Sequence, residues 1–249
     1  WGRLVPQIVY YFAAYAQLLK AGKITFGDKV DFCVPTGNFG DILAGYYAKQ
    51  MGLPVGKLVC ASNENNVLTD FLTTGTYTAK REFFKTTSPS MDILVSSNLE
   101  RLLYLLSGDT KLVASLMKQL KEEGAYTVPD PLKAAIQKEF WAAYCDDARA
   151  AEIIGRVYRE QHYLCDPHTA SGFAACGKLF NSLFGVDYMA VMVLSAVVIV
   201  GYTIMGGFRA VSTTDLIQSV VMSMALIAVL VYGVSVAGGW DVVLDNARS

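Results

Sequence analysis

The stretch Val34–Tyr47, with the sequence VPTGNFGDILAGYY, holds the residues best suited to bind an anion. It follows the strand-like run Lys29–Cys33 and opens a helical run that continues to about Met51. A turn between a strand and a helix presents unpaired backbone N–H groups and the positive end of the helix dipole. Gly37 and Gly40 permit the backbone angles of such a turn and let an anion approach without meeting a Cβ atom. The stretch therefore predicts a phosphate cradle, although the glycines alone suit a plain strand–turn–helix corner equally well.

A second polar cluster follows a second predicted strand. The apolar run Lys57–Ala61 leads into residues 62–66, with the sequence SNENN. Strand, helix and strand with short connections predict an open, largely parallel sheet, in which ligands bind beyond the carboxyl ends of the strands. The clusters at 36–41 and 62–66 both fall at such ends, so we expect a site there.

Helical periodicity dominates the rest of the first 175 residues, and most predicted helices begin at a residue suited to N-capping. Asp41 is expected as an N-cap or first-turn acid, and the polar segment 73–90 as a loop near the site. The expected helices are Pro6–Leu19, Asp41–Met51, Val67–Thr74, Asn98–Leu106, Thr110–Glu123, Asp130–Tyr144 and Asp147–Gln161.

The segment from His162 to Cys176 allows two interpretations. His162, Cys165 and His168 are spaced by three and could, with Cys176, be drawn as a metal site. Pro167 breaks the helix that would align them, and residues 166–169 are typical of a turn that caps a new helix at Thr169. We therefore predict no metal. The five cysteines are scattered and odd in number, which indicates a reducing compartment and no disulfide framework.

Charge divides the chain in two. Residues 1–175 carry 18 basic and 18 acidic side chains, whereas residues 176–249 carry seven charged side chains in all. Uncharged stretches of 21 and 25 residues, at 188–208 and 216–240, are each long enough to cross a bilayer. The tail is therefore expected to form two transmembrane helices, with a buried hairpin of a soluble protein as the alternative. The net charge of −1 gives no indication of nucleic-acid binding.

Residues 1–175 resemble the threonine synthase family. The resemblance is carried by Val34–Tyr47, Ala61–Gly75, Ser88–Leu103, Asp166–Ala170 and the opening sequence WGRLVPQIVYY. It implies an α/β fold: part of the three-layer, tryptophan synthase β-like domain of fold type II pyridoxal phosphate (PLP) enzymes. The family converts O-phosphohomoserine and water into threonine and phosphate by β,γ-replacement, in the cytoplasm.

The resemblance also implies roles for particular residues. Gly37, Asn38, Phe39 and Gly40 would bind the PLP phosphate, and Thr169 would hydrogen-bond the pyridine nitrogen. A neutral hydroxyl there would leave that nitrogen largely unprotonated. Further residues would contact the substrate: Asn63, Asn65, Asp70, Ser97, Asn98 and Arg101.

An arginine and a lysine limit what the resemblance implies. Arg101 is a natural bidentate partner for the substrate phosphate, but an ordinary charge on a helix surface explains it equally well. The Schiff-base lysine of the family belongs to a motif that none of the lysines here matches. Since that lysine is the general base at the α-carbon, we expect this chain, a fragment starting at Trp1 without Met, to be inactive alone.

Residues 176–249 resemble the sodium:solute symporter family, most closely its proline transporters. The resemblance is carried by Gly177–Gly185, Tyr202–Phe208 and Ala210–Gln218, although Thr213 stands where that family usually has Trp. It implies Na⁺ as the coupling ion, a lipid bilayer as the surroundings and Asp215 as an acid on the sodium pathway. Two helices cannot build such a transport site. We therefore interpret the chain as an accidental fusion, with a membrane-tethered enzyme as the competing hypothesis.

Overall fold

The computed structural model describes residues 2–184, and the side chains of residues 2–179. The helices and strands that it describes belong to one compact unit, which begins at residue 3. The predicted transmembrane helices at 188–208 and 216–240 and the predicted sodium-pathway residue Asp215 lie outside the described residues. Among the helices that are described, none has both the length and the apolar character needed to cross a membrane.

The centre of the described unit is a three-stranded parallel sheet. Its strands are β1 (Val30–Pro35), β2 (Val55–Ser62) and β5 (Phe140–Tyr144), in the spatial order β1-β2-β5. Because the strands are parallel, their carboxyl ends lie at one edge of the sheet. The prediction of a largely parallel sheet, with both polar clusters following strand ends, is confirmed.

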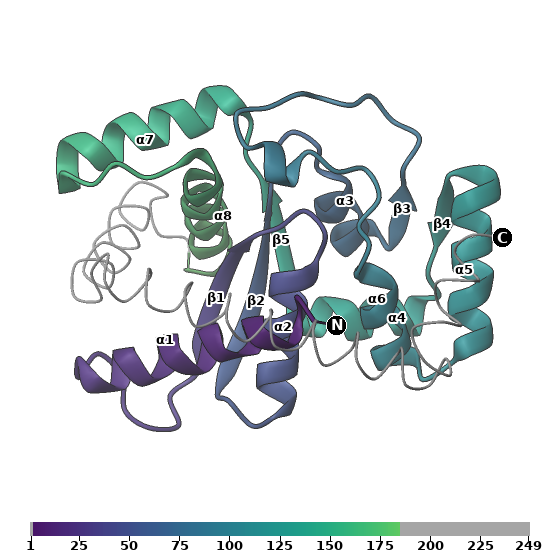
Figure 1. Ribbon diagram of the computed structural model, residues 1–249, viewed down its shortest axis with the longest axis horizontal. Coiled ribbons are helices and arrows are strands. Elements are labelled where there is room, and N and C mark those ends of the chain that lie inside the picture. The colour runs from purple at the N-terminus through teal and green to yellow at the C-terminus, as the bar shows by residue number, and fades with distance from the viewer. Residues whose placement is uncertain (1, 185–249) are drawn as a thin grey trace, which may run out of the picture. The chain divides into compact units, whose positions relative to one another are not determined.

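Helices cover both faces of this sheet, as the three-layer prediction requires (Figure 1). On one face, Leu58 and Cys60 belong to the large hydrophobic core, while on the other Val59 and Ala61 pack with Leu179. Alternate residues of β2 thus serve two cores, as expected for a strand buried on both sides. The first core is covered by α1 (Ile8–Lys20), α2 (Gly40–Gln50), α3 (Val67–Thr74) and α6 (Asp130–Glu139). The second is covered by α8 (Pro167–Phe184), which packs in turn against α7 (Asp147–Gln161) in a separate cluster.

The predicted helices agree with the structure except at some ends. The helices α5 (Thr110–Glu123) and α7 begin and end where the sequence predicted. Their N-caps are Asp109, whose side chain accepts from two backbone N–H groups, and Asp146, which accepts from one. The helix α4 spans Leu99–Ser107, and short 3₁₀ turns span Val5–Gln7 and Pro89–Met91.

One predicted helix was wrong in its second half. The expected helix Asp130–Tyr144 ends at Glu139, and the remaining residues form β5, which pairs with β2 from Leu58 to Ser62. Neither Gly nor Pro marks the change, so the sequence carries no local stop signal. The strand forms because the run FWAAY can fill the third position of a sheet buried on both faces, and this tertiary pairing outweighs helix propensity.

A small second sheet was not predicted. The strands β3 (Thr76–Thr78) and β4 (Ala125–Thr127) pair antiparallel, with Tyr77 opposite Tyr126. Their rings are stacked, with centroids 5.3 Å apart and planes at 2°. Three-residue strands are too short to show alternation, so pattern alone could not indicate them.

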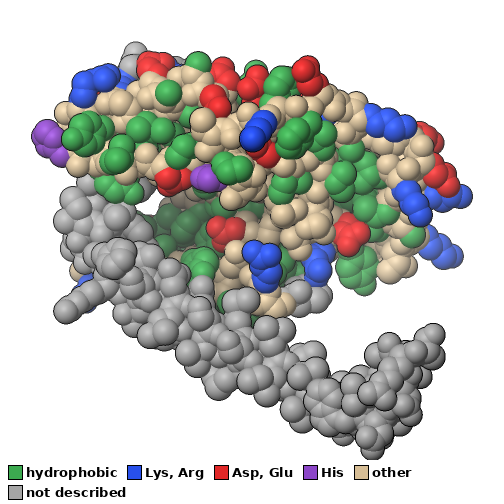
Figure 2. All heavy atoms as spheres, turned by 45° about the horizontal axis from the view of Figure 1, so that its top comes forward, with side chains coloured by type: hydrophobic (Ala, Val, Ile, Leu, Met, Phe, Trp, Pro, Cys, Tyr) green, Lys and Arg blue, Asp and Glu red, His purple; other side chains and the backbone are tan. Residues whose placement is uncertain are grey.

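The helix α8 crosses the predicted domain boundary without a break. It begins at Pro167 rather than at Thr169 and continues to Phe184. Ala175 and Leu179, on either side of residues 175/176, both pack against the sheet in one cluster. The boundary itself stays a prediction. Over the described face in Figure 2, basic and acidic side chains are interspersed, as is typical of an ordinary solvated surface.

Candidate functional site

The predicted anion-binding turn lies where expected, between β1 and α2. Its left-handed residue is Phe39, with φ 60° and ψ 16°, whereas neither Gly37 nor Gly40 has a positive φ. The expectation that the glycines supply the unusual angles was therefore wrong. A bulky residue with positive φ is uncommon and persists only where its surroundings hold it. The Phe39 side chain is fully buried, and its ring centroid lies 5.5 Å from that of Phe140.

Gly37 is needed for close packing. A Cβ atom at this position would lie 2.7 Å from the backbone oxygen of Ser90, which is too close for any real contact. A Cβ atom at Gly40 would meet the Asn98 amide at 3.5 Å, an ordinary contact distance. The first glycine therefore lets two backbone segments approach, while the second leaves the start of α2 open.

The segment Ser96–Asn98 lies behind the turn and holds its carbonyl groups. Ser96 Oγ donates to the Gly37 carbonyl at 3.0 Å. The backbone N–H and the side-chain amide of Asn98 both donate to the Asn38 carbonyl, at 3.1 and 2.9 Å. Ser97 Oγ donates to Asn38 Oδ1 at 3.2 Å. The structure thus brings together Asn38, Ser97 and Asn98, three residues predicted for the site from separate parts of the sequence.

These bonds orient the N–H groups of the turn. In a planar trans peptide, the C=O and N–H of one unit point in opposite directions. Since the carbonyls of Gly37 and Asn38 face the segment Ser96–Asn98, the N–H groups of Asn38 and Phe39 face away from it. Within residues 2–184, the N–H groups of Gly37, Asn38, Phe39 and Gly40 donate to no protein acceptor. Four donors at a helix N-terminus fit an anion with several oxygens, such as a phosphate.

Asp41 follows in the first turn of α2, as one of the two alternatives predicted. Burial raises the pKa of its carboxyl group to about 6, and the neighbouring Tyr11 hydroxyl only partly offsets this effect. The Tyr11 hydroxyl has one proton, which it donates to the backbone carbonyl of Asp41 at 2.8 Å. Asp41 Oδ1 is buried and has no partner among the described residues.

Thr169 lies in the first turn of α8, where Asp166 acts as the cap. The Asp166 carboxylate accepts from the backbone N–H groups of His168 and Thr169, at 2.9 and 3.3 Å, and from Thr169 Oγ1 at 2.5 Å. Burial would raise the pKa of Asp166, but hydrogen bonds from Thr169 and His168 outweigh it and lower the pKa. One turn later, Gly172 packs against Pro35 at the end of β1. Thr169 therefore lies toward the same edge of the sheet as the phosphate turn.

The Thr169 hydroxyl has one proton, and in this structure it is donated to Asp166. A cofactor nitrogen without a proton would need that proton, so the hydroxyl would have to turn away from the carboxylate. A protonated nitrogen could instead donate to the Thr169 oxygen as it stands.

Asn63 and Asn65 are buried and hold a loop. Asn63 Nδ2 lies 2.7 Å and Asn65 Nδ2 lies 3.0 Å from Asp92 Oδ1. Thr86 also donates to this carboxylate, through its N–H and its hydroxyl. Burial would raise the pKa of Asp92, but these hydrogen bonds prevail and lower it. Both asparagines thus have a structural task, and their predicted contact with substrate stays a prediction.

The other predicted substrate residues lie nearby on helices. Asp70, on α3, pairs with Arg81 at 2.8 Å, and Arg81 also donates to Asn66. Arg101 is half-buried on α4, close enough to Tyr47 of α2 for its charge to counter part of the burial effect that raises the pKa of Tyr47. Both interpretations of Arg101 therefore stay open.

The residues weighed as metal ligands have other surroundings. His162 ends α7 with φ 53° and is exposed, Cys165 is buried, and His168 Nδ1 lies 3.0 Å from Asp166. In the described part of the chain, no three His, Cys, Asp or Glu side chains gather as a metal would require.

Sequence reasoning missed Ser96, Asp92 and Tyr77, which position the site from behind. Ser96 adjoins the predicted pair Ser97 and Asn98 within the resembling segment Ser88–Leu103, which was the signal that could have found it. Asp92 and Tyr77 act across more than fifteen residues of chain, which no local pattern reveals.

Comparisons with known proteins agree with this geometry. The chain is 47% identical over 172 residues to "Threonine synthase-like 1" of Macaca fascicularis, covering 68% of this chain and 23% of that protein. It is 43% identical to the threonine synthase of Eremothecium gossypii, covering 72% of this chain and 37% of that protein. A crystal structure of PLP-bound threonine synthase from Brucella melitensis superposes with a TM-score of 0.66 at 45% identity, covering 72% of this chain and 37% of the other.

The N-terminal part of this chain is homologous to threonine synthases. The α/β architecture expected from the resemblance is therefore the fold of this threonine synthase-like part. The part spans well under half of the length of the relatives it matches. The sodium:solute symporter family model matches residues 165–249, so its match begins just before α8 and ahead of the predicted boundary at 175/176. The chain thus combines two similarities, as predicted.

Proposed function

We propose that residues 1–175 are the C-terminal part of a PLP-dependent, threonine synthase-like enzyme. The proposed reaction converts O-phosphohomoserine and water into threonine and phosphate. The observation that carries this proposal is the turn Gly37–Gly40, whose four N–H groups lack protein acceptors among the described residues and whose carbonyls are held from behind. The turn lies in a segment similar to a threonine synthase that binds PLP.

In this proposal, the residues of this chain bind and orient the cofactor. The N–H groups of Gly37, Asn38, Phe39 and Gly40 bind the cofactor phosphate, helped by the N-terminal dipole of α2. Gly37 allows the segment at Ser90 to pack against the turn. Bound PLP supplies an electron sink next to the reacting carbons of the substrate. Thr169 contacts the pyridine nitrogen, at the same edge of the sheet.

We assign binding of the substrate phosphate to the residues at the C-terminal end of the segment Ser96–Asn98 and at the start of α4. Ser97 and Asn98 lie beside Asn38, directly before α4, and Arg101 lies in the first turn of that helix. An arginine can bind two phosphate oxygens at once. Asn63, Asn65 and Asp70 shape the neighbouring wall through the loop that they anchor.

We also propose that this chain is inactive by itself. A threonine synthase needs a lysine that carries the cofactor and moves the proton at the α-carbon. No lysine here matches that motif. Activity would then require the remaining part of such an enzyme.

Binding of PLP and of pyridoxal, which lacks the phosphate, tests the proposal. The 249-residue chain is titrated with each, and binding is followed by protein fluorescence. We expect PLP to bind at least about tenfold more tightly, because several charge-assisted hydrogen bonds are worth more than about 1.4 kcal/mol together. Equal affinities for the two compounds would overturn the assignment of the turn.

A pair of glycine variants sharpens this test. Gly37→Ala forces the turn and the Ser90 backbone apart and should abolish the preference for PLP. Gly155→Ala, in the middle of α7, meets only the flexible end of Arg159 and serves as the control. A preference that survives Gly37→Ala would contradict the model of phosphate binding.

For the tail we propose a separate origin in a sodium:solute symporter. The match of that family to residues 165–249 favours this second candidate. In this proposal residues 176–249 form membrane helices at about 188–208 and 216–240, Asp215 lies on a Na⁺ pathway, and residues 1–175 lie in the cytoplasm. The join is then accidental. Sequencing of single DNA molecules from the source tests this hypothesis. If single molecules span codons 165–185 in one reading frame and continue upstream to a lysine-bearing PLP domain, the hypothesis of an accidental join is wrong and a membrane-tethered enzyme takes its place.

A further inference from the structure

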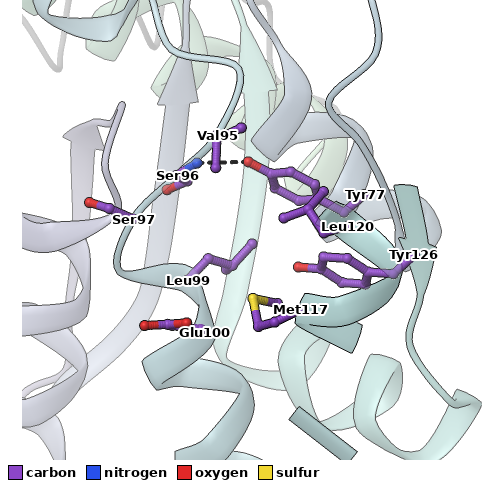
Figure 3. Close-up of a pocket in the computed structure, with 9 residues that line it drawn as sticks. All are labelled: Tyr77, Val95, Ser96, Ser97, Leu99, Glu100, Met117, Leu120 and Tyr126. Atoms are coloured by element: carbon purple, nitrogen blue, oxygen red, sulfur yellow. Dashed lines mark hydrogen bonds between the residues drawn. The ribbon is translucent and has the colours of Figure 1, made fainter. Parts of the chain in front are cut away.

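The small sheet β3–β4 lies beside the segment that holds the phosphate turn. Tyr77 and Tyr126 face each other across this sheet and form one wall of a cavity of about 120 Å³ (Figure 3). The cavity is lined mainly by apolar side chains of α4 and α5 and by the residues that precede α4. Its lining includes Ser96, Leu99, Met117 and Leu120 besides the two tyrosines.

The two tyrosines have similar rings but different hydroxyl groups. The Tyr77 hydroxyl donates to the Leu94 carbonyl at 3.0 Å and accepts from the Ser96 N–H at 2.8 Å. The Tyr126 hydroxyl points into the cavity in Figure 3, and among the described residues it makes no hydrogen bond. One ring therefore fastens the segment 94–96, while its neighbour only fills space beside it.

We propose that Tyr77 is a positioning residue for the phosphate-binding turn, acting through Ser96. The proposal rests on the proposed function of the turn. The Tyr77 hydroxyl fixes the backbone of Ser96, and Ser96 Oγ donates to the Gly37 carbonyl at 3.0 Å. That bond turns the Gly37 carbonyl backward and the Asn38 N–H forward, because both belong to one planar peptide. A phenol in the small sheet thus sets the direction of a donor in the turn.

The hydroxyl is suited to this task because it bridges two backbone groups two residues apart. Its proton goes to Leu94 and its oxygen accepts from Ser96, so the span between them is held at both ends. Val95, between them, is 55% exposed and adds little packing of its own. The ring is 1% exposed and is held by Phe71 and Tyr126, which gives the hydroxyl a rigid base.

Tyr77→Phe and Tyr126→Phe form a matched pair for the test. Each removes one hydroxyl group from one ring of the same stack. In the 249-residue chain, the affinity ratio of PLP to pyridoxal is measured by titration, and hydrogen exchange of the Ser96 amide, which donates to Tyr77, is measured without ligand. We expect Tyr77→Phe to lower the ratio about three- to tenfold, the effect of one lost hydrogen bond of about 1 kcal/mol, and to speed exchange at Ser96. Tyr126→Phe should leave both unchanged.

Each outcome decides between distinct conclusions. If the unchanged chain does not prefer PLP, the proposed function fails before Tyr77 is tested. If the chain prefers PLP but Tyr77→Phe keeps the ratio, or both variants lower it equally, Tyr77 is not a positioning residue. Should Tyr77→Phe fail to fold, Ser96→Ala removes only the last bond of the series, and an unchanged ratio there overturns the proposal.

Discussion

Asp41 and Asp166 both lie at the start of a helix near the same edge of the sheet, yet their carboxyl groups are in opposite conditions. Asp41 is largely buried, one of its oxygens lacks a described partner, and burial raises its pKa to about 6. Asp166 is 58% exposed in its side chain and accepts four hydrogen bonds, two from His168 and two from Thr169, which lower its pKa.

The difference separates two ways of building a helix start. The α8 start is local, since Asp166 and the residues that it binds are adjacent in the chain. The α2 start is assembled from distant parts: Phe140, Tyr11 and the segment Ser96–Asn98 reach it from three other elements. A local cap keeps its charge solvated and paired. The assembled start of α2 holds its N–H donors in a fixed arrangement, and it tolerates a carboxyl group that is poorly solvated.

The strongest way to break the α2 start is to remove the ring that anchors it. Phe39→Ala should lower the free energy of unfolding by about 3–5 kcal/mol, because a fully buried ring leaves a cavity. Urea unfolding followed by circular dichroism measures the change. Phe83→Ala is the control, since Phe83 is 55% exposed and should change stability by less than about 0.5 kcal/mol. Similar losses in both variants would show that the burial of Phe39 does not hold the turn.

The next effect concerns pH. With a folded pKa near 6 and an unfolded value near 3.9, Asp41 binds more protons in the folded state, so its contribution falls as pH rises from about 4 to 6. Asp41→Asn should remove this pH-dependent loss of stability. As pH rises from about 4 to 7, the free energy of unfolding of the variant should increase by on the order of 2 kcal/mol relative to that of the unchanged chain. Urea unfolding at a series of pH values gives the difference. A constant difference across this range would contradict a raised pKa.

The smallest effect is expected at the local cap. Asp166→Ala should lower stability by about 1 kcal/mol, as loss of an N-cap generally does. Since the folded pKa of Asp166 is lowered, its contribution is present above about pH 4 and is lost as pH falls further. Asp130→Ala is the comparison, because Asp130 starts α6 without accepting a cap bond. If the two variants behave alike at pH 7 and at pH 3, the cap bonds of Asp166 contribute nothing measurable.

The same contrast explains how far the sequence could predict the fold. The helix starts at Thr110 and Asp147 and the capping turn at residues 166–169 were all recognised, because a cap and its partners lie within a few residues of one another. The parallel sheet and the position of the phosphate turn were also predicted, since hydrophobic runs and glycines are local signals. The strand Phe140–Tyr144 was missed because its formation depends on β2, about eighty residues earlier.

The candidate site shows the same limit. Gly37–Gly40 could be found from composition, and resemblance added Ser97 and Asn98. Asn98 was expected to cap α4, but its side chain donates to Asn38 instead, sixty residues away. Tyr77 gave no sign of its role, because hydrogen bonds to backbone groups leave no trace in the identity of the residues that receive them.

Because α8 is continuous through residues 175 and 176, the directions of the side chains on the two sides of this predicted boundary are fixed relative to one another. Each residue of an α-helix advances the side-chain direction by about 100°. One residue inserted after Ala175 would therefore rotate Leu179 away from the sheet against which Ala175 and Leu179 now pack together. A join at this predicted boundary would therefore have to preserve helical register as well as reading frame, at least as far as Leu179.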